Sequence, residues 1–148
     1  MPSMKEFVND LFGEPHGVFR YLNDFINHSP AGPYKLVAHN IAAGKTGSHK
    51  RWSGFHNSRF RLSAIPVHHG PIPALAWRVD IDNHSITFSG DMNGDWHTLE
   101  KLAAGSDILL AHNAITEGTT GVARKLHMPP FVIGQIAANA KVKKLVLS

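Results

Sequence analysis

Cysteine is absent from this sequence, and so is any long apolar run. Without cysteine there are no disulfide bonds, thiolate metal ligands or cysteine nucleophiles. A transition-metal site must therefore use His, Asp or Glu, which suits Zn, Mn or Fe. Membrane spans need roughly 18 apolar residues, so no membrane partner is expected. The N-terminal residues do not resemble a signal peptide, and the cytoplasm is the default for a compartment that the sequence does not identify.

Charge is also scarce. Charged residues are 18% of the 148 residues, and 15 Lys+Arg against 11 Asp+Glu give a net charge of +4. This composition is typical of a globular domain, and a chain of this length buries roughly two-thirds of its unfolded surface. The excess charge permits an anionic substrate but is far below the basic stripe of nucleic-acid-binding domains. Histidine, in contrast, is abundant, with 11 residues.

The first third of the chain has helical patterns. Ser3 and Glu6 have the spacing of a capping box and precede an apolar face that ends at Gly13, which predicts a helix between them. A second helix is expected over 16–27 and a short strand over 34–41.

A polar, basic loop is expected over 42–58, and the pattern changes after it. The expected elements are strands over 60–67, 74–81 and 85–89, a helix over 95–104, a strand over 107–111, a helix over 130–140 and a strand over 143–148. This order predicts an α/β fold in which helices pack on one sheet.

Two of the expected strands end in residues that can bind metal. The first ends in Val67-His68-His69-Gly70-Pro71 and the second in Phe88-Ser89-Gly90-Asp91. Active sites of α/β folds gather where strands end and loops begin, and an imidazole and a carboxylate held there are metal ligands. On spacing alone, a hydrogen-bonded structural histidine is the more frequent outcome. His68 should face away from His69 on a strand and be structural, while His84 and His97 should be solvated.

Several ordered segments together resemble the metallo-β-lactamase superfamily, in its branch of ribonuclease Z and similar arylsulfatase-like or phosphodiesterase-like hydrolases. The segments that carry the resemblance are 65–79, 85–91, 102–110, 127–130 and 135–147. The resemblance is good over 60–148 and loose over 1–59. It implies a metallo-β-lactamase-like αβ/βα sandwich, with residues 1–148 as a single partial, C-terminal domain.

The resemblance also implies a role for three residues. His69 matches a metal ligand, Asp91 matches the carboxylate that bridges two metals, and His127 matches the histidine that protonates the leaving group. The implied cofactor is Zn, with two ions in the intact family and Mn or Fe as alternatives. The implied reaction is hydrolysis of a phosphodiester or related ester, RNA among them, by metal-bound hydroxide.

The sequence departs from the family's pattern in three places. The run His-x-His-x-Asp-His is absent, and the chain ends before the family's last histidine ligand. The family's His-Glu-Ala is replaced by Ala111-His112-Asn113-Ala114, which leaves His112 as the candidate for the glutamate's place. We therefore expect a C-terminal half of a hydrolase, with weak or no metal binding and little activity as an isolated chain.

Two other functions stay open beside the hydrolase. One is a non-catalytic half-domain that associates with another chain or forms a homo-oligomer, because half a sandwich leaves an apolar sheet face uncovered. The other is a small RNA-binding module on the basic segment 45–61, where Trp52 lies beside Lys50 and Arg51. A mobile loop that covers the site explains these three residues better, since the net charge is low.

Overall fold

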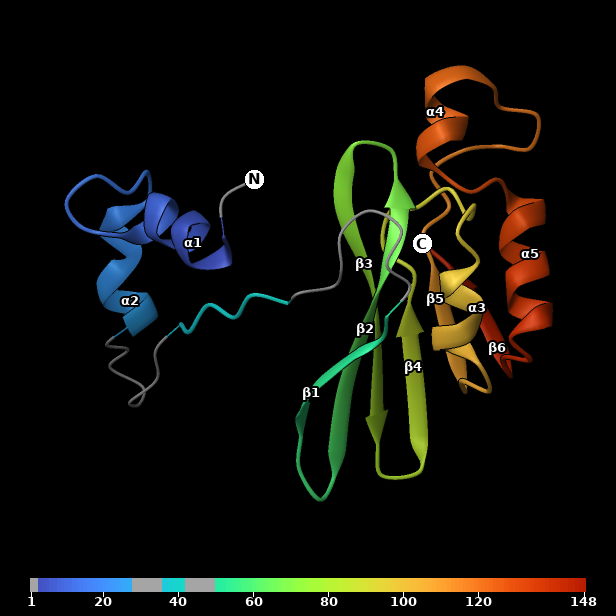
Figure 1. Cartoon of the computed structure of the whole chain (residues 1–148), viewed down its shortest axis with the longest axis horizontal. Coiled ribbons are helices and arrows are strands. Elements are labelled where there is room, and N and C mark those ends of the chain that lie inside the picture. Colours follow the sequence, from blue (N-terminus) through green and yellow to red (C-terminus); the bar gives the residue numbers. More distant parts are fainter. Residues whose placement is uncertain (1–2, 28–35, 42–49) are drawn as a thin grey trace. The chain divides into compact units, whose positions relative to one another are not determined.

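The computed structural model describes residues 3–27, 36–41 and 50–148. The chain divides into two compact units, Met1–Ile41 and Ala42–Ser148. Figure 1 draws the first unit in blue to cyan and the second in green to red. The domain limits expected from the sequence stay predictions. Within the described ranges, no helix is long and apolar enough to cross a membrane.

The first unit begins with the predicted capped helix, α1 (Met4–Phe12). The Ser3 hydroxyl accepts a hydrogen bond from the Glu6 N–H at 3.1 Å, and the Ser3 N–H donates to the Glu6 carboxylate at 2.6 Å. This capping box satisfies two N–H groups that the first turn of a helix leaves unpaired. The helix ends before Gly13, so the prediction for this segment is confirmed.

The second helix of this unit is shorter than predicted. A 3₁₀ turn, η1 (Arg20–Leu22), leads into α2 (Asn23–Asn27). The N–H groups of Val18 and Phe19 donate to carbonyls of α1 and not to carbonyls one turn earlier in their own segment. The segment from 16 to 19 is therefore not helical. No strand forms over 36–41, and the rest of the strand predicted over 34–41 lies outside the described residues.

The second unit contains one mixed sheet of six strands, in the order of their sequence. The first four strands are antiparallel, and the last two run parallel to β4. The strands are β1 (Trp52–His56), β2 (Phe60–His69), β3 (Ile72–Ile81), β4 (His84–Phe88), β5 (Ile108–Ala111) and β6 (Lys144–Leu147). The loop prediction is wrong for β1, which pairs with β2 through a bulge at Gly54. Residues 42–49 of that loop lie outside the described residues.

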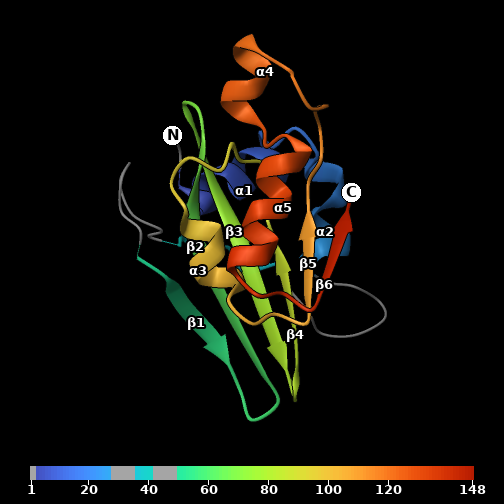
Figure 2. The same ribbon diagram turned by 90° about the vertical axis from the view of Figure 1, so that its right-hand side faces the viewer.

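Three helices belong to this unit: α3 (Thr98–Ala103), α4 (Gly121–Leu126) and α5 (Pro130–Asn139). Figures 1 and 2 show α3 and α5 on the same side of the sheet. α3 starts later than predicted because His97 has a left-handed φ of 52°, which a continuous α-helix does not allow. α4 was not predicted, and Pro130 begins α5 where the sequence placed it.

The two faces of the sheet differ in their cover. Alternate residues of each strand point to opposite faces, so one face packs under α3 and α5 and forms the core. Its buried strand residues are Ile65, Val67, Ala76, Leu109 and Ala111. The opposite face, called the open face below, buries Ala64 and Pro66 of β2 but keeps most of its larger apolar residues partly exposed. These are Leu62, Trp77, Val79, Ile86, Phe88 and Leu110.

Candidate metal centre

The candidate metal centre lies where two strands end. β2 ends at His69, and the chain leaves β4 through Ser89 and Gly90 to reach Asp91. β3 lies between these two strands, so they are not adjacent in the sheet. Glycine is required at position 90, because its φ is +62° and an added Cβ would lie 2.7 Å from the Leu75 carbonyl oxygen. This close approach allows the turn that brings Asp91 back beside the end of β2.

The His69 ring has a fixed orientation. It is buried, with 9% of the residue exposed, and its Nδ1 lies 3.0 Å from the carbonyl oxygen of Leu126. Because a carbonyl only accepts, Nδ1 is the donor in this contact, which leaves Nε2 as the nitrogen that can bind a metal. Nε2 lies 3.9 Å from Asp91 Oδ2. A metal-binding histidine is usually held in this way, by a backbone carbonyl on its other nitrogen.

The Asp91 carboxylate lies between two imidazoles. Its Oδ2 faces His69, and its Oδ1 lies 3.1 Å from Nε2 of His112. His112 directly follows β5. The His112 side chain is 41% exposed and the Asp91 side chain is 49% exposed. The sequence marked His112 only as a departure from the family's pattern. Its place at a third strand end is the signal that could have included it in the site.

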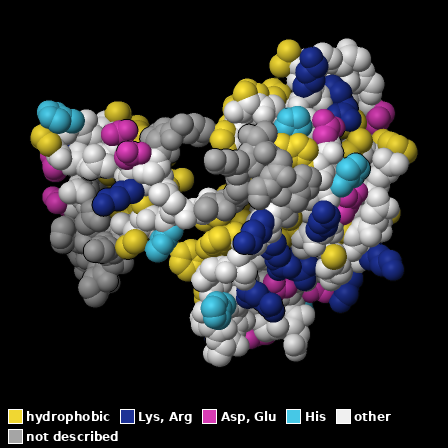
Figure 3. Space-filling model, in the orientation of Figure 1, with side chains coloured by type: hydrophobic (Ala, Val, Ile, Leu, Met, Phe, Trp, Pro, Cys, Tyr) yellow, Lys and Arg dark blue, Asp and Glu magenta, His cyan; other side chains and the backbone are white. Residues whose placement is uncertain are grey.

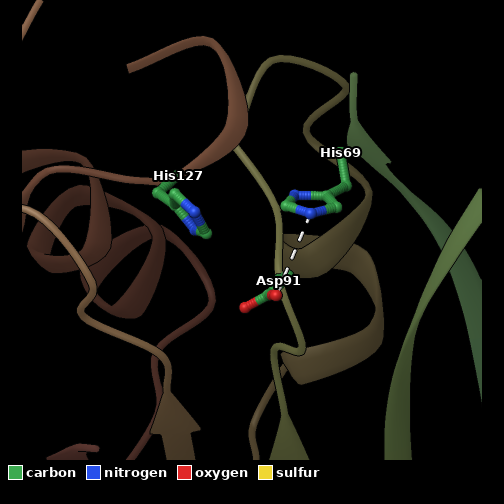
Figure 4. Close-up of side chains that lie close together, drawn as sticks. All are labelled: His69, Asp91 and His127. Carbon is green, nitrogen blue, oxygen red and sulfur yellow. Dashed lines mark ion pairs between the residues drawn. The ribbon is translucent and has the colours of Figure 1, made fainter. Parts of the chain in front are cut away.

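His127 completes the cluster from the loop after α4. Its ring centre lies 5.3 Å from that of His69 and 5.8 Å from that of His112. Its Nδ1 is buried without a hydrogen-bond partner among the described residues. Ligand atoms of His69, Asp91 and His127 all lie within 4.8 Å of one another, and Figure 4 shows the three side chains around a common space. The structure therefore brings together all three residues that the sequence singled out.

Two imidazoles and a carboxylate fit a divalent cation of the zinc, manganese or iron type. Metal–ligand distances of about 2 Å place two ligand atoms at most about 4 Å apart. The ligand atoms of His69, Asp91 and His127 lie within 4.8 Å of one another, which is close to that spacing. Three protein ligands are the usual number in a catalytic zinc site, whereas structural sites use four.

Asn93 ties the loop after Asp91 to the segment before His127. The residue is 2% exposed, and its Nδ2 lies 2.8 Å from the Lys125 carbonyl oxygen, 2.9 Å from Asp95 Oδ2 and 2.9 Å from His68 Nδ1. Its Oδ1 accepts from the Asp95 N–H at 3.0 Å. The sequence did not indicate a role for Asn93, because a polar side chain in a glycine-containing loop resembles an ordinary turn residue.

The remaining histidines of this region have structural or solvent-exposed positions. His68 stacks on Trp96, with ring centres 4.9 Å apart and planes at 11°. It lies on the opposite face from His69, as predicted. His84 is exposed in the β3–β4 hairpin, and His97 is 75% exposed beside Glu100.

The whole chain, residues 1–148, matches the sequence profile of the family described as "Beta-lactamase superfamily domain". The chain belongs to this superfamily. The resemblance stated from the sequence is confirmed, and so is the predicted fold class. No curated protein matches the sequence.

Two solved structures have the same fold. The metallo-beta-lactamase fold protein YhfI from Bacillus subtilis has a TM-score of 0.54 and 18% identity over 64% of this chain. The short form of human tRNase Z has a TM-score of 0.57 and 24% identity over 66% of this chain. The chain covers 38% of the length of each of these two proteins.

Proposed function

We propose that this chain belongs to a metal-dependent hydrolase that cleaves a phosphodiester or related ester. Superfamily membership supports a hydrolase. The observation that carries the proposal is the convergence of His69, Asp91 and His127, whose ligand atoms lie within 4.8 Å of one another. These side chains come from segments 58 residues apart, counted from His69 to His127, so local sequence does not explain their meeting.

In this proposal His69 and Asp91 bind a divalent cation, with Zn as the first candidate and Mn or Fe as alternatives. When bound, such a cation lowers the pKa of water and polarises the ester. The Leu126 carbonyl holds His69 with Nε2 toward the site. His112 holds the other oxygen of Asp91 at 3.1 Å and so fixes the plane of the carboxylate. Both contacts reduce the freedom that the two ligands would lose on binding.

His127 is proposed to protonate the departing oxygen. An imidazole titrates near neutral pH and can donate a proton without a large change in its surroundings. Its position beside His69, with ring centres 5.3 Å apart, supports this role, since an ester bound by a cation at His69 would lie close to the His127 ring. The same position allows His127 to act as a third metal ligand instead. The two roles differ in whether its loss reduces turnover or metal affinity.

An anionic ester is the proposed substrate class. Arg124 and Lys125 occupy the last turn of α4, which ends at Leu126, one residue before His127. Their charges favour an anion near the site. The likeness to a tRNase Z supports a phosphodiester, with RNA as one candidate. With three donors and no His-x-His-x-Asp-His in the sequence, we expect weak metal binding and little turnover from this chain by itself.

The test combines metal content with turnover. Zinc binding to the chain is measured by competition with a chromophoric chelator, and hydrolysis is followed with bis(p-nitrophenyl) phosphate. His69→Ala and Asp91→Ala should each abolish zinc binding, whereas His127→Ala should reduce any turnover more than affinity. His84→Ala, an exposed histidine in a hairpin, is the matched control. Zinc binding that survives both His69→Ala and Asp91→Ala contradicts the proposal.

A non-catalytic half-domain is the second candidate. The partly exposed apolar residues of the open face favour it, since a monomer rarely leaves a large apolar patch uncovered. This candidate expects no zinc binding and a concentration-dependent mass in analytical ultracentrifugation. If the chain belongs to a hydrolase, we expect zinc binding that depends on His69, whatever the mass measured for the assembly.

A further inference from the structure

Three arginines gather on the helix-bearing face of the sheet, near the β1 edge. In the β2–β3 pairing Arg61 lies opposite Asp80, and Ser63 lies opposite Arg78. Residues two apart on a strand share a face, so these four side chains form one patch. Arg51, just before β1, joins the patch because its Nη2 donates to Ser63 Oγ at 2.7 Å. We call Arg51, Arg61 and Arg78 the arginine cluster.

The arginine cluster has more positive than negative charge. Asp80 pairs with Arg78 at 2.9 Å, and in the described part of the chain no carboxylate pairs with Arg51 or Arg61. Arg78 also donates to the carbonyls of Leu102 and Ala104, at 3.0 and 2.8 Å, which satisfies the end of α3. Arg78 therefore has a structural role, and Arg51 and Arg61 supply the excess charge.

Burial, and next the charge of Arg78, lower the pKa of Arg51, with Arg61 adding to the effect and Asp80 opposing it. The guanidinium groups are thus close enough to repel one another, and a bound anion would relieve that repulsion. Lys and Arg side chains also gather on one side of the larger unit in Figure 3. A guanidinium presents paired N–H donors that match a phosphate, so phosphate is the anion that best fits this patch.

The edge strand β1 adds aromatic side chains to the same edge. Trp52 and Phe55 lie on the open face of the sheet, with ring centres 5.5 Å apart, and Phe55 is 38% exposed. Arg51 and Trp52 are consecutive, so one edge offers cations on one face and aromatic rings on the other. Single-stranded nucleic acids use both, phosphates on cations and bases on rings. Acidic peptides and anionic membranes would use the cations alone.

We propose that the arginine cluster and the neighbouring Trp52–Phe55 pair bind single-stranded RNA through its phosphodiester backbone. The site is separate from the metal centre. Arg61 precedes His69 by eight residues on β2, which corresponds to about 26 Å along an extended strand. The inference stands on the charge and register of this edge and does not need the proposed hydrolase.

The test measures RNA binding by the whole chain in EDTA, so that the metal centre plays no part. The probe is a fluorescein-labelled twelve-residue oligouridylate, followed by anisotropy over a series of salt concentrations. Arg51→Gln and Arg61→Gln should each weaken binding and reduce the slope of log K against log salt by about 0.7, the value for one phosphate contact on a single strand. Asp80→Asn should strengthen binding, because it removes the carboxylate of the patch.

Arg59→Gln is the matched control. It removes the same charge, but from a β1–β2 turn residue that pairs with Asp82 at 3.6 Å outside the arginine cluster. It should leave both affinity and slope unchanged. Arg51→Lys keeps the charge and lacks the paired donors, so it should bind more weakly than the parent chain while folding normally by circular dichroism.

Three results would overturn the proposal. One is an absence of RNA binding at low salt. Another is equal weakening by Arg59→Gln and Arg51→Gln, which would assign binding to net charge. The third is displacement of RNA by polyglutamate and not by unlabelled oligouridylate, which would identify an acidic protein as the partner.

Discussion

On one face of the sheet Leu109 is completely buried beneath the helices, and on the other face its neighbour Leu110 stays partly exposed. Both belong to β5, and both faces of this strand are apolar. The same contrast separates Val67 and Ala76 on the covered face from Ile86 and Phe88 on the open face. Apolar side chains are therefore present on both faces, but most of the large ones that are fully buried lie on the face under α3 and α5.

This contrast separates the part of the second unit that stabilises the fold from the part that carries the candidate ligands. The hydrophobic effect stabilises in proportion to the area removed from water, so the covered face contributes most of the free energy of unfolding. The metal centre lies at the end of this face, where His69 follows the buried residues of β2. The rigid core thus holds the strand ends from which the candidate ligands project.

The largest expected effect is a loss of core packing. Leu109→Ala should lower the free energy of unfolding by about 2–5 kcal/mol, because it leaves a cavity in the packed core between the sheet and the helices. Leu110→Ala removes the same atoms from the open face and should cost less than half as much. Urea denaturation followed by circular dichroism compares the two variants. Equal losses would contradict the assignment of the core to the covered face.

The next effect concerns Asn93 at the polar end of the covered face. Asn93→Ala removes a buried amide and leaves the Lys125 carbonyl, in a partly buried contact, without this donor, and should lower the free energy of unfolding by about 1–3 kcal/mol. Asn93→Asp keeps the shape of the side chain but places a carboxylate oxygen next to the Lys125 carbonyl and the Asp95 carboxylate. Because these groups repel one another, we expect a similar or larger loss of unfolding free energy. Asn139→Ala, whose side chain makes one exposed bond of 3.4 Å, is the control and should change little.

A smaller, pH-dependent effect lies at the opposite end of the parallel strands. The Lys143 ammonium, together with the Ser85 N–H, lowers the pKa of Asp107 to about 2. A carboxyl whose folded pKa is depressed stabilises the fold above its ordinary value of 3.8, and this contribution is lost as the pH falls through about 2. Asp107→Asn should flatten the dependence of urea stability on pH between these values. An unchanged pH profile would contradict the role of this pair.

The smallest effect is expected on the open face itself. Ile86→Thr keeps a β-branched side chain at a position that is 36% exposed. It should change the free energy of unfolding by no more than about 1 kcal/mol. A loss as large as that of Leu109→Ala would mean that something covers this face in solution, and would remove the contrast between the two faces.

Much of the second unit could be predicted from its sequence. Alternating residues marked β2, β3 and β4, and the proline pair at 129–130 marked the start of α5. His69, Asp91 and His127 followed from a resemblance carried by several ordered segments, and the structure brings them together. Such features depend on local patterns or on short motifs, which a single sequence contains in full.

Other features depend on contacts distant in the sequence. β1 contains Gly54 and follows charged residues, so only its pairing with β2 reveals a strand. α4 has six residues, too few to show helical periodicity. The structural role of Asn93 depends on its hydrogen bond to the Lys125 carbonyl, 32 residues away. The role of His112 depends on its contact with Asp91, which comes from the end of another strand. No local pattern contains such pairings.

The most direct test of the metal centre is a zinc titration followed by the ring nitrogen signals of histidine in nuclear magnetic resonance. The account predicts that zinc first shifts the signals of His69, with Nε2 as its binding nitrogen, and of His127, while those of the exposed His84 and His97 stay in place. This measurement detects weak binding as well as tight binding. A titration in which the exposed histidines shift first, or in which His69 does not respond, would contradict the central claim.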